Sequence, residues 1–313
     1  MVEQQDRDAA VVAIGIARGG YVRTADLLGA GFVRRSRELY ERGGVLTRVA
    51  RGLYLVVDLE RPDVSDDRLR RACARAGGDV VVGRETAARL HGIVGGPTFA
   101  PISLIVAAGR RDPKLPGVDV KRCDIPPDDV QTLDDLAVTT PLRTVVDCAR
   151  YSDRLTAVCL LESAARQDLV MLGEVSRRLG HLRRAPYVRR AKERLDLADV
   201  RSESPLETAV RLPLLDARLP LPFLCGGIAG RIDIAYPVEL LGGRLGGRYV
   251  GLAIEADGRE PHIQAETFHH DRARQTALEE AGWLVRRFTD HSLRAGPSYV
   301  VETTRRAIAT VVT

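Results

Sequence analysis

Lysine is scarce in this sequence, and its cysteines show no pairing pattern. Lysine occurs only at Lys114, Lys121 and Lys192, so arginine supplies almost all of the basic charge. The five cysteines are scattered without a CxxC spacing, which argues against a zinc site and a disulfide framework. No apolar run approaches the length of a membrane span, and the polar, acidic residues 1–10 do not resemble a secretory signal. We therefore expect a cytoplasmic protein with no membrane partner.

The composition is that of a folded protein with an excess of basic charge. At 313 residues, with 45% hydrophobic and 28% charged residues, the chain is long enough for two or three domains. The net charge of +5 fits nucleic-acid binding, although an arginine bias is also what a GC-rich genome produces. The positions of the arginines are therefore more informative than their number.

Residues 1–58 predict three short helices followed by a β-hairpin. Helices are expected over 8–20, from the N-cap Thr24 to 31, and over 32–44, each ended by glycine. Two short strands are expected within 45–57. This order is typical of a winged helix-turn-helix.

Arginines gather on the two elements of this block that would touch duplex DNA, the third helix and the wing. In such a fold the helix enters the major groove and the wing contacts phosphates. The candidate DNA-binding residues are Arg34, Arg35, Ser36, Arg37 and Arg42 on the helix, and Arg48 and Arg51 on the wing. The alternative is that these arginines solvate an exposed helix of a small interaction domain.

Residues 62–200 predict a middle α/β domain without recognisable catalytic chemistry. Strands are expected over 79–83, 102–108 and 118–123, and helices over 84–92, 139–150, 154–167, 172–180 and 187–198. His91 has no metal-spaced partner, so we expect a structural role for it. The basic stretch 174–201 could extend a DNA-facing surface or form an ordinary solvated face.

Residues 202–313 predict an α/β sandwich. Helices are expected over 202–222, 266–282 and 298–312, and strands over 230–237, 249–256 and 283–289. Asp233 and Glu255 fall on neighbouring strands, and Asp257 shares a face with Glu255 because strand side chains alternate. Like charges at the end of a buried strand oppose each other's ionisation, so either a cation or a protonated partner is expected nearby.

Two family resemblances follow from these motifs. "ESPLE", "RIDIAYP", "LAIEADG", a nearby His262 and "HDRARQTALEEAGWLVRRFT" together resemble the Vsr-like branch of the PD-(D/E)XK nuclease superfamily. "RVARGLYLV" resembles the winged helix of AbiEi-type antitoxins, and the middle block resembles the second domain of those proteins more loosely. The expected fold is therefore α/β multidomain: a winged helix-turn-helix, a middle α/β domain and a PD-(D/E)XK, restriction-endonuclease-like sandwich.

The nuclease resemblance implies a Mg²⁺ or Mn²⁺ site for phosphodiester hydrolysis. Asp233, Glu255 and Asp257 would hold the ion, and His262 would act as general base or phosphate contact. Glu207, on the first helix of the site, would be the second catalytic residue and could contact the metal. The superfamily's lysine is replaced by Asp257, and the spacing from Gly258 to His262 is one residue longer than is usual in that branch.

Each of these residues also has a structural interpretation. Glu207 completes a capping box that begins at Ser204. Glu255 could pair with Arg231 or Arg274, and Asp257 could belong to a glycine turn. Trp283 is expected in the core.

The predicted function is that of a DNA-binding protein with a metal-dependent endonuclease-like domain that acts on double-stranded DNA. The alternative is a non-enzymatic AbiEi-like antitoxin or transcriptional autorepressor, with an inactive nuclease-like scaffold and a cognate toxin or operator as partner. A third possibility is a protein-interaction module whose basic surface meets an acidic partner.

Overall fold

The computed structural model describes residues 11, 13–14, 21–42, 45–50, 53–56, 69, 72–73, 76, 79–96, 101–110, 115, 117–134, 136–220, 222–226, 232–244, 246–257 and 275–313. It divides into two compact units, one of Met1–His91 with Pro97–Thr144 and one of Gly92–Gly96 with Val145–Thr313. The division differs from the three predicted blocks, because the middle block contributes a sheet to the first unit and helices to the second.

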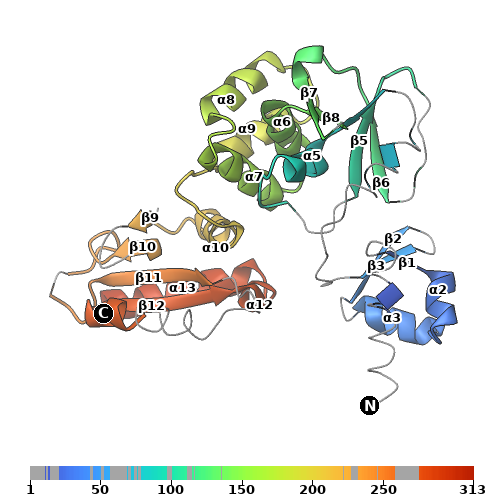
Figure 1. Ribbon diagram of the computed structural model, residues 1–313. Helices are drawn as coiled ribbons and strands as arrows, with labels where there is room; N and C mark the ends of the chain where they lie inside the picture. Colours follow the sequence, from blue (N-terminus) through green and yellow to red (C-terminus); the bar gives the residue numbers. More distant parts are fainter. Residues whose placement is uncertain are drawn as a thin grey trace. The chain divides into compact units, whose positions relative to one another are not determined.

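The N-terminal part of the first unit is a small antiparallel sheet with two short helices. β1 (Tyr21–Arg23) leads into α2 (Thr24–Gly29) and α3 (Arg34–Arg42), and β2 (Leu46–Ala50) and β3 (Leu53–Val56) follow. The strand order is β1-β3-β2 (Figure 1). β1 is not among the predicted strands, because three residues carry no period. Phe32 and Tyr40 meet edge to face in the core, with ring centroids 4.9 Å apart.

The other sheet of the first unit is mixed and has the order β6-β5-β4-β8-β7. Its elements are β4 (Val80–Val82), α5 (Arg84–Leu90), β5 (Ile102–Val106), β6 (Val118–Arg122), the 3-10 helix η1 (Pro127–Asp129), β7 (Val130–Leu133) and β8 (Leu136–Thr139). β5 is buried throughout, as a strand covered on both faces should be. His91 has the expected structural role, since its Nε2 lies 2.7 Å from the carbonyl oxygen of Thr139.

A run of helices follows: α6 (Pro141–Tyr151), α7 (Arg154–Arg166), α8 (Leu172–His181) and α9 (Val188–Leu195). α7 begins at the N-cap Asp153, whose carboxylate accepts a hydrogen bond from the amide of Thr156 at 3.0 Å. Residues 156–164 are all buried, so α7 is the central helix of this part. None of the helices that the structure describes is long and apolar enough to cross a membrane.

The C-terminal part contains a four-stranded mixed sheet with the order β12-β11-β10-β9. Its elements are α10 (Pro205–Asp216), β9 (Phe223–Gly226), β10 (Ile232–Pro237), β11 (Gly251–Asp257), β12 (Trp283–Thr289), α12 (Asp290–Leu293) and α13 (Pro297–Val312). β11 and β12 are parallel, and the other pairs are antiparallel. The predicted helix over 202–222 is wrong in extent: it ends at Asp216, and the unpredicted β9 follows.

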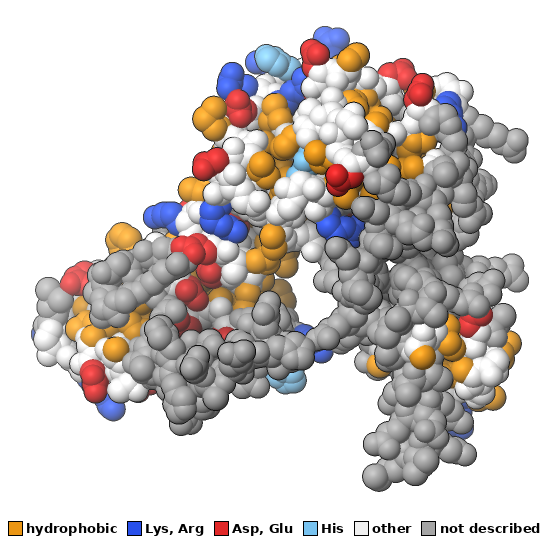
Figure 2. Space-filling model, in the orientation of Figure 1, with side chains coloured by type: hydrophobic (Ala, Val, Ile, Leu, Met, Phe, Trp, Pro, Cys, Tyr) orange, Lys and Arg blue, Asp and Glu red, His pale blue; other side chains and the backbone are white. Residues whose placement is uncertain are grey.

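Both faces of this sheet carry apolar side chains. On one face Ile234, Leu252 and Ile254 pack with residues of α10 and α13. On the other, Ala253 packs with Leu278, from the helical residues 275–280, and with Trp283, which lies in the core as predicted. The expectation of an α/β protein built from several parts is confirmed. Figure 2 shows charged side chains of both signs interspersed with apolar ones on the visible surface.

Candidate nucleic-acid interface and carboxylate cluster

The exposed arginines of the N-terminal part lie on α3 and β2. Arg34 and Arg35 are exposed on the first turn of α3, and Arg48 is exposed on β2. The Arg34 side chain is 86% exposed and its Nε lies 2.9 Å from Oε1 of Glu38, one turn later. This carboxylate raises the pKa of the Arg34 guanidinium by hydrogen bonding and charge. These three cations are accessible to an anionic partner.

Two other predicted DNA contacts on α3 have structural roles. Ser36 is only 9% exposed, and its hydroxyl accepts from the Val33 amide and donates to the Val33 carbonyl, both at 3.0 Å. This hydroxyl is therefore engaged at the start of α3, and its contact with DNA stays a prediction. The guanidinium of half-buried Arg37 lies 5.6 Å from the ring centroid of Tyr54, which braces α3 against β3. Arg42 belongs to α3, and Arg51 lies outside the described residues.

Asp233 and Glu255 lie on adjacent antiparallel strands, as the sequence predicts. Ile234 of β10 pairs with Ile254 of β11, so Asp233 and Glu255 face each other one step further along the same register. Oδ2 of Asp233 accepts a hydrogen bond from the Ala256 amide at 2.9 Å. Glu255 is 7% exposed. The two carboxylates therefore share one end of the sheet.

Asp257 has an arginine beside it. Nη1 of Arg287 donates to Oδ2 of Asp257 at 3.2 Å, and both side chains are about one-third exposed. Arg287 stands level with Glu255 in the parallel register of β11 and β12. A positive charge thus lies next to this run of carboxylates, and it belongs to the protein itself.

Glu207 makes capping contacts, and its pKa also depends on the charge of Asp233. The Ser204 hydroxyl accepts from the Glu207 amide at 3.1 Å, and Oε2 of Glu207 accepts from the Glu203 amide at 2.8 Å. The return bond therefore reaches the residue before the N-cap. Burial, and then the negative charge of Asp233, raise the pKa of Glu207 to about 7. A third carboxylate is thus electrostatically coupled to this end of the sheet.

Two of the predicted metal ligands have partners within the protein. Among the residues that the structure describes, no group of three or more His, Cys, Asp or Glu side chains is placed to hold an ion. Asp257 forms an ion pair with Arg287, and Asp233 accepts a hydrogen bond from the Ala256 amide. The predicted base His262 lies outside the described residues, as do Arg231 and Arg274.

A buried ion pair that sequence reasoning missed joins α7 to α10. Nη2 of Arg211 donates to Oε1 of Glu162, and the two side chains are 5% and 3% exposed. Glu162 also accepts from the Thr208 hydroxyl, and from the Asp199 amide at 2.9 Å. Burial raises the pKa of Glu162. Each partner is the one charged residue within an apolar stretch of its helix. This pattern could have indicated a buried charge that needs a partner.

Comparisons with known proteins show that part of the chain is similar to an antitoxin domain. Residues 80–197 match the family described as AbiEi antitoxin C-terminal domain, which confirms the expected likeness for this part of the chain. The chain is also similar to uncharacterized proteins Rv2248 and MT2308 from two strains of Mycobacterium tuberculosis. Each is 28% identical over 258 residues, which cover 80% of this chain and 88% of the relative.

One solved structure is similar over part of the chain. The crystal structure of the RV2827C protein from Mycobacterium tuberculosis covers 61% of this chain and 76% of its own, with a TM-score of 0.30 and 18% identity.

Proposed function

We propose that the protein is a DNA-binding regulator of the antitoxin type, whose N-terminal part contacts duplex DNA. The observation that carries this proposal is the match of residues 80–197 to the AbiEi antitoxin C-terminal domain. By this likeness, the partners would be a cognate toxin and an operator. The C-terminal sheet would then serve as a scaffold.

The arrangement of the N-terminal part supports the duplex contact. Its order of β1, α2, α3, β2 and β3 would suit a winged helix, in which α3 would enter the major groove and the β2–β3 hairpin would form the wing. Arg34 and Arg35 would meet DNA from α3, and Arg48 from the wing. Arg37 would hold the angle of α3 through Tyr54.

Binding to the DNA upstream of its own gene tests this proposal. Fluorescence anisotropy would compare duplexes that tile this region with an unrelated duplex of equal length. We expect the wild type to prefer one tile, and Arg35→Glu/Arg48→Glu to lose binding to every tile. The matched control Arg305→Glu/Arg306→Glu, on α13, reverses the same charge at exposed positions and should bind normally. Equal loss in both variants would contradict a role for α3 and the wing.

A second candidate function is metal-dependent cleavage of DNA. It is favoured by the coupling of Glu207 to Asp233, and by the opposition of Asp233 to Glu255. Hard carboxylate oxygens are what Mg²⁺ or Mn²⁺ would require, and His262 stays the base predicted from sequence.

Thermal melting with and without Mn²⁺ separates this candidate from a scaffold. Metal that binds only the folded state would stabilise it by about 2.7 kcal/mol at about 100 times its dissociation constant. Asp233→Asn, which can still accept the Ala256 amide, should gain far less. An unchanged melting temperature at millimolar Mn²⁺, together with intact plasmid DNA, would rule out cleavage.

A further inference from the structure

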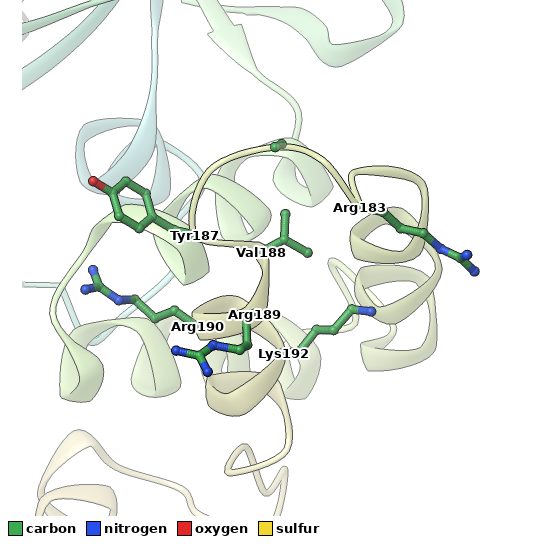
Figure 3. Close-up of a pocket in the computed structure, with 7 residues that line it drawn as sticks. Arg183, Tyr187, Val188, Arg189, Arg190 and Lys192 are labelled. Carbon is green, nitrogen blue, oxygen red and sulfur yellow. The ribbon is translucent and has the colours of Figure 1, made fainter.

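A basic hollow lies where the α8–α9 connection meets the start of α9. Its volume is about 580 Å³, which is within the range of ligand sites. It is lined by Arg183, Ala185, Tyr187, Val188, Arg189, Arg190 and Lys192 (Figure 3). All of these residues belong to the second compact unit.

The cations of the hollow are exposed and are arranged as a row. Arg183, Arg189, Arg190 and Lys192 are all exposed. From left to right, Figure 3 shows Arg190, Arg189, Lys192 and Arg183, with the ends of Arg190 and Arg183 pointing outward in opposite directions. One carboxylate lies near them, with Oε1 of Glu193 3.6 Å from Nε of the largely exposed Arg189. A row of cations matches the successive phosphates of an extended polynucleotide better than it matches one compact anion.

An aromatic platform stands at one end of this row. Tyr187 is 54% exposed, and the guanidinium of Arg190 lies 5.0 Å from its ring centroid. The rings of Tyr151 and Tyr187 meet edge to face with centroids 5.6 Å apart, and the guanidinium of Arg150 lies 4.7 Å from the Tyr151 ring centroid. A pair of aromatic rings is therefore flanked by a cation on each side, Arg150 toward the interior and Arg190 at the surface.

Arg150, at the buried side of these contacts, holds the backbone next to the exposed Tyr187 in place. Arg150 is 7% exposed, and its Nε donates to the carbonyl of Pro186 at 3.0 Å, immediately before Tyr187. Tyr187 itself has φ of 61°, a conformation that is unusual for a bulky side chain and needs support from its surroundings. The Tyr187 ring is thus presented to solvent in a defined position, with little side-chain entropy left to lose on binding.

We propose that this hollow binds single-stranded polynucleotide. An unpaired base would stack on the Tyr187–Arg190 platform, while the neighbouring phosphates would follow Arg189, Lys192 and Arg183. A duplex does not expose base faces, so the platform selects single strands. The inference uses a different surface from α3 and does not rest on the duplex contact proposed above. Single-stranded DNA and RNA share this chemistry, and RNA adds the 2′-hydroxyl.

The first test measures anisotropy of fluorescein-labelled oligothymidylate, oligouridylate and a duplex of equal length on the full chain. We expect both single strands to bind with an affinity that falls as salt rises; a preference for oligouridylate would identify RNA as the ligand. Tyr187→Ala should weaken single-strand binding about tenfold or more, whereas Tyr187→Phe should stay within about twofold. Duplex binding should be equal in all three proteins.

Charge variants keep the test decisive if Tyr187→Ala fails to fold. Arg189→Gln/Arg190→Gln should weaken single-strand binding and flatten its salt dependence. The control Arg305→Gln/Arg306→Gln removes the same charge from exposed positions on α13 and should have no such effect. The inference is overturned if neither single strand binds, if binding survives a folded Tyr187→Ala, or if both double variants weaken it equally.

Discussion

The exposed arginines of α3 differ from the buried arginines of the α6–α10 helices in what surrounds their guanidinium groups. The Arg34 side chain is 86% exposed and pairs with a neighbour on its own helix. Arg211 is 4% exposed and holds the buried Glu162. Arg194 is 6% exposed, and its two terminal nitrogens donate to the carbonyls of Ala149 and Ser152 at 2.6 Å. Burial lowers the pKa of Arg194.

The difference shows why the basic excess has no single meaning. A buried guanidinium pairs with the carboxylates and carbonyls around it. Removing it leaves those polar groups buried without a partner, which destabilises the folded state. An exposed guanidinium contributes little to stability but can exchange its partner for a phosphate. The comparison predicts that buried arginines control folding and that exposed arginines control binding.

Loss of Arg211 should give the largest effect on stability. Arg211→Met leaves Glu162 buried without its guanidinium partner, so we expect the free energy of unfolding to fall by about 3–5 kcal/mol. Urea denaturation would measure this loss, with exposed Arg305→Met as the matched control. Adding Glu162→Gln to Arg211→Met should recover part of the loss, since the stranded charge is gone. A loss below about 1 kcal/mol for the single variant would show that Glu162 and Arg211 do not form a buried ion pair in solution.

Glu207 should make stability depend on pH. Its pKa is raised from an ordinary 4.5 to about 7, so the folded state holds this proton more tightly than the unfolded state does. The resulting stabilisation is complete below about pH 4.5 and is lost as the pH rises through about 7, an effect of about 3 kcal/mol. Glu207→Gln removes this dependence and keeps an acceptor for the Glu203 amide. The melting temperature of both proteins should be measured from about pH 4.5 to about pH 8. We expect the melting temperature of the wild type to fall relative to that of the variant as the pH rises. The same pH dependence in both proteins would show that Glu207 does not have a raised pKa.

The exposed Arg34–Glu38 pair should have the smallest effect. Glu38→Gln removes a partner from a fully solvated guanidinium, so the melting temperature should not change measurably. Duplex binding should tighten by up to about fivefold, because one negative charge no longer faces the phosphates. A clear drop in melting temperature without a change in affinity would show that this pair of α3 contributes to stability and not to DNA binding.

Local patterns predicted the elements that have enough length to show a period. Glycine stops and apolar spacing located α3, α5 and α7, and strand alternation placed Asp233 opposite Glu255. β1, β7, β8 and β9 were not predicted, because each has only three or four residues and shows no alternation; β4 is as short, but its three consecutive valines mark it as a strand. The arginine beside Asp257 and the partner of Glu162 were beyond prediction, because pairing across elements is set by the register of β11 with β12 and by the packing of α7 on α10.

The salt dependence of duplex binding tests the central claim most directly. The logarithm of the association constant falls with the logarithm of salt concentration by about 0.9 for each phosphate contact. For Arg35→Gln/Arg48→Gln we therefore predict a slope that is shallower than the wild type's by about 2, with an unchanged melting temperature. If the slope is the same in both proteins, or if the wild type binds duplex DNA without any salt dependence, then α3 and the wing do not contact DNA.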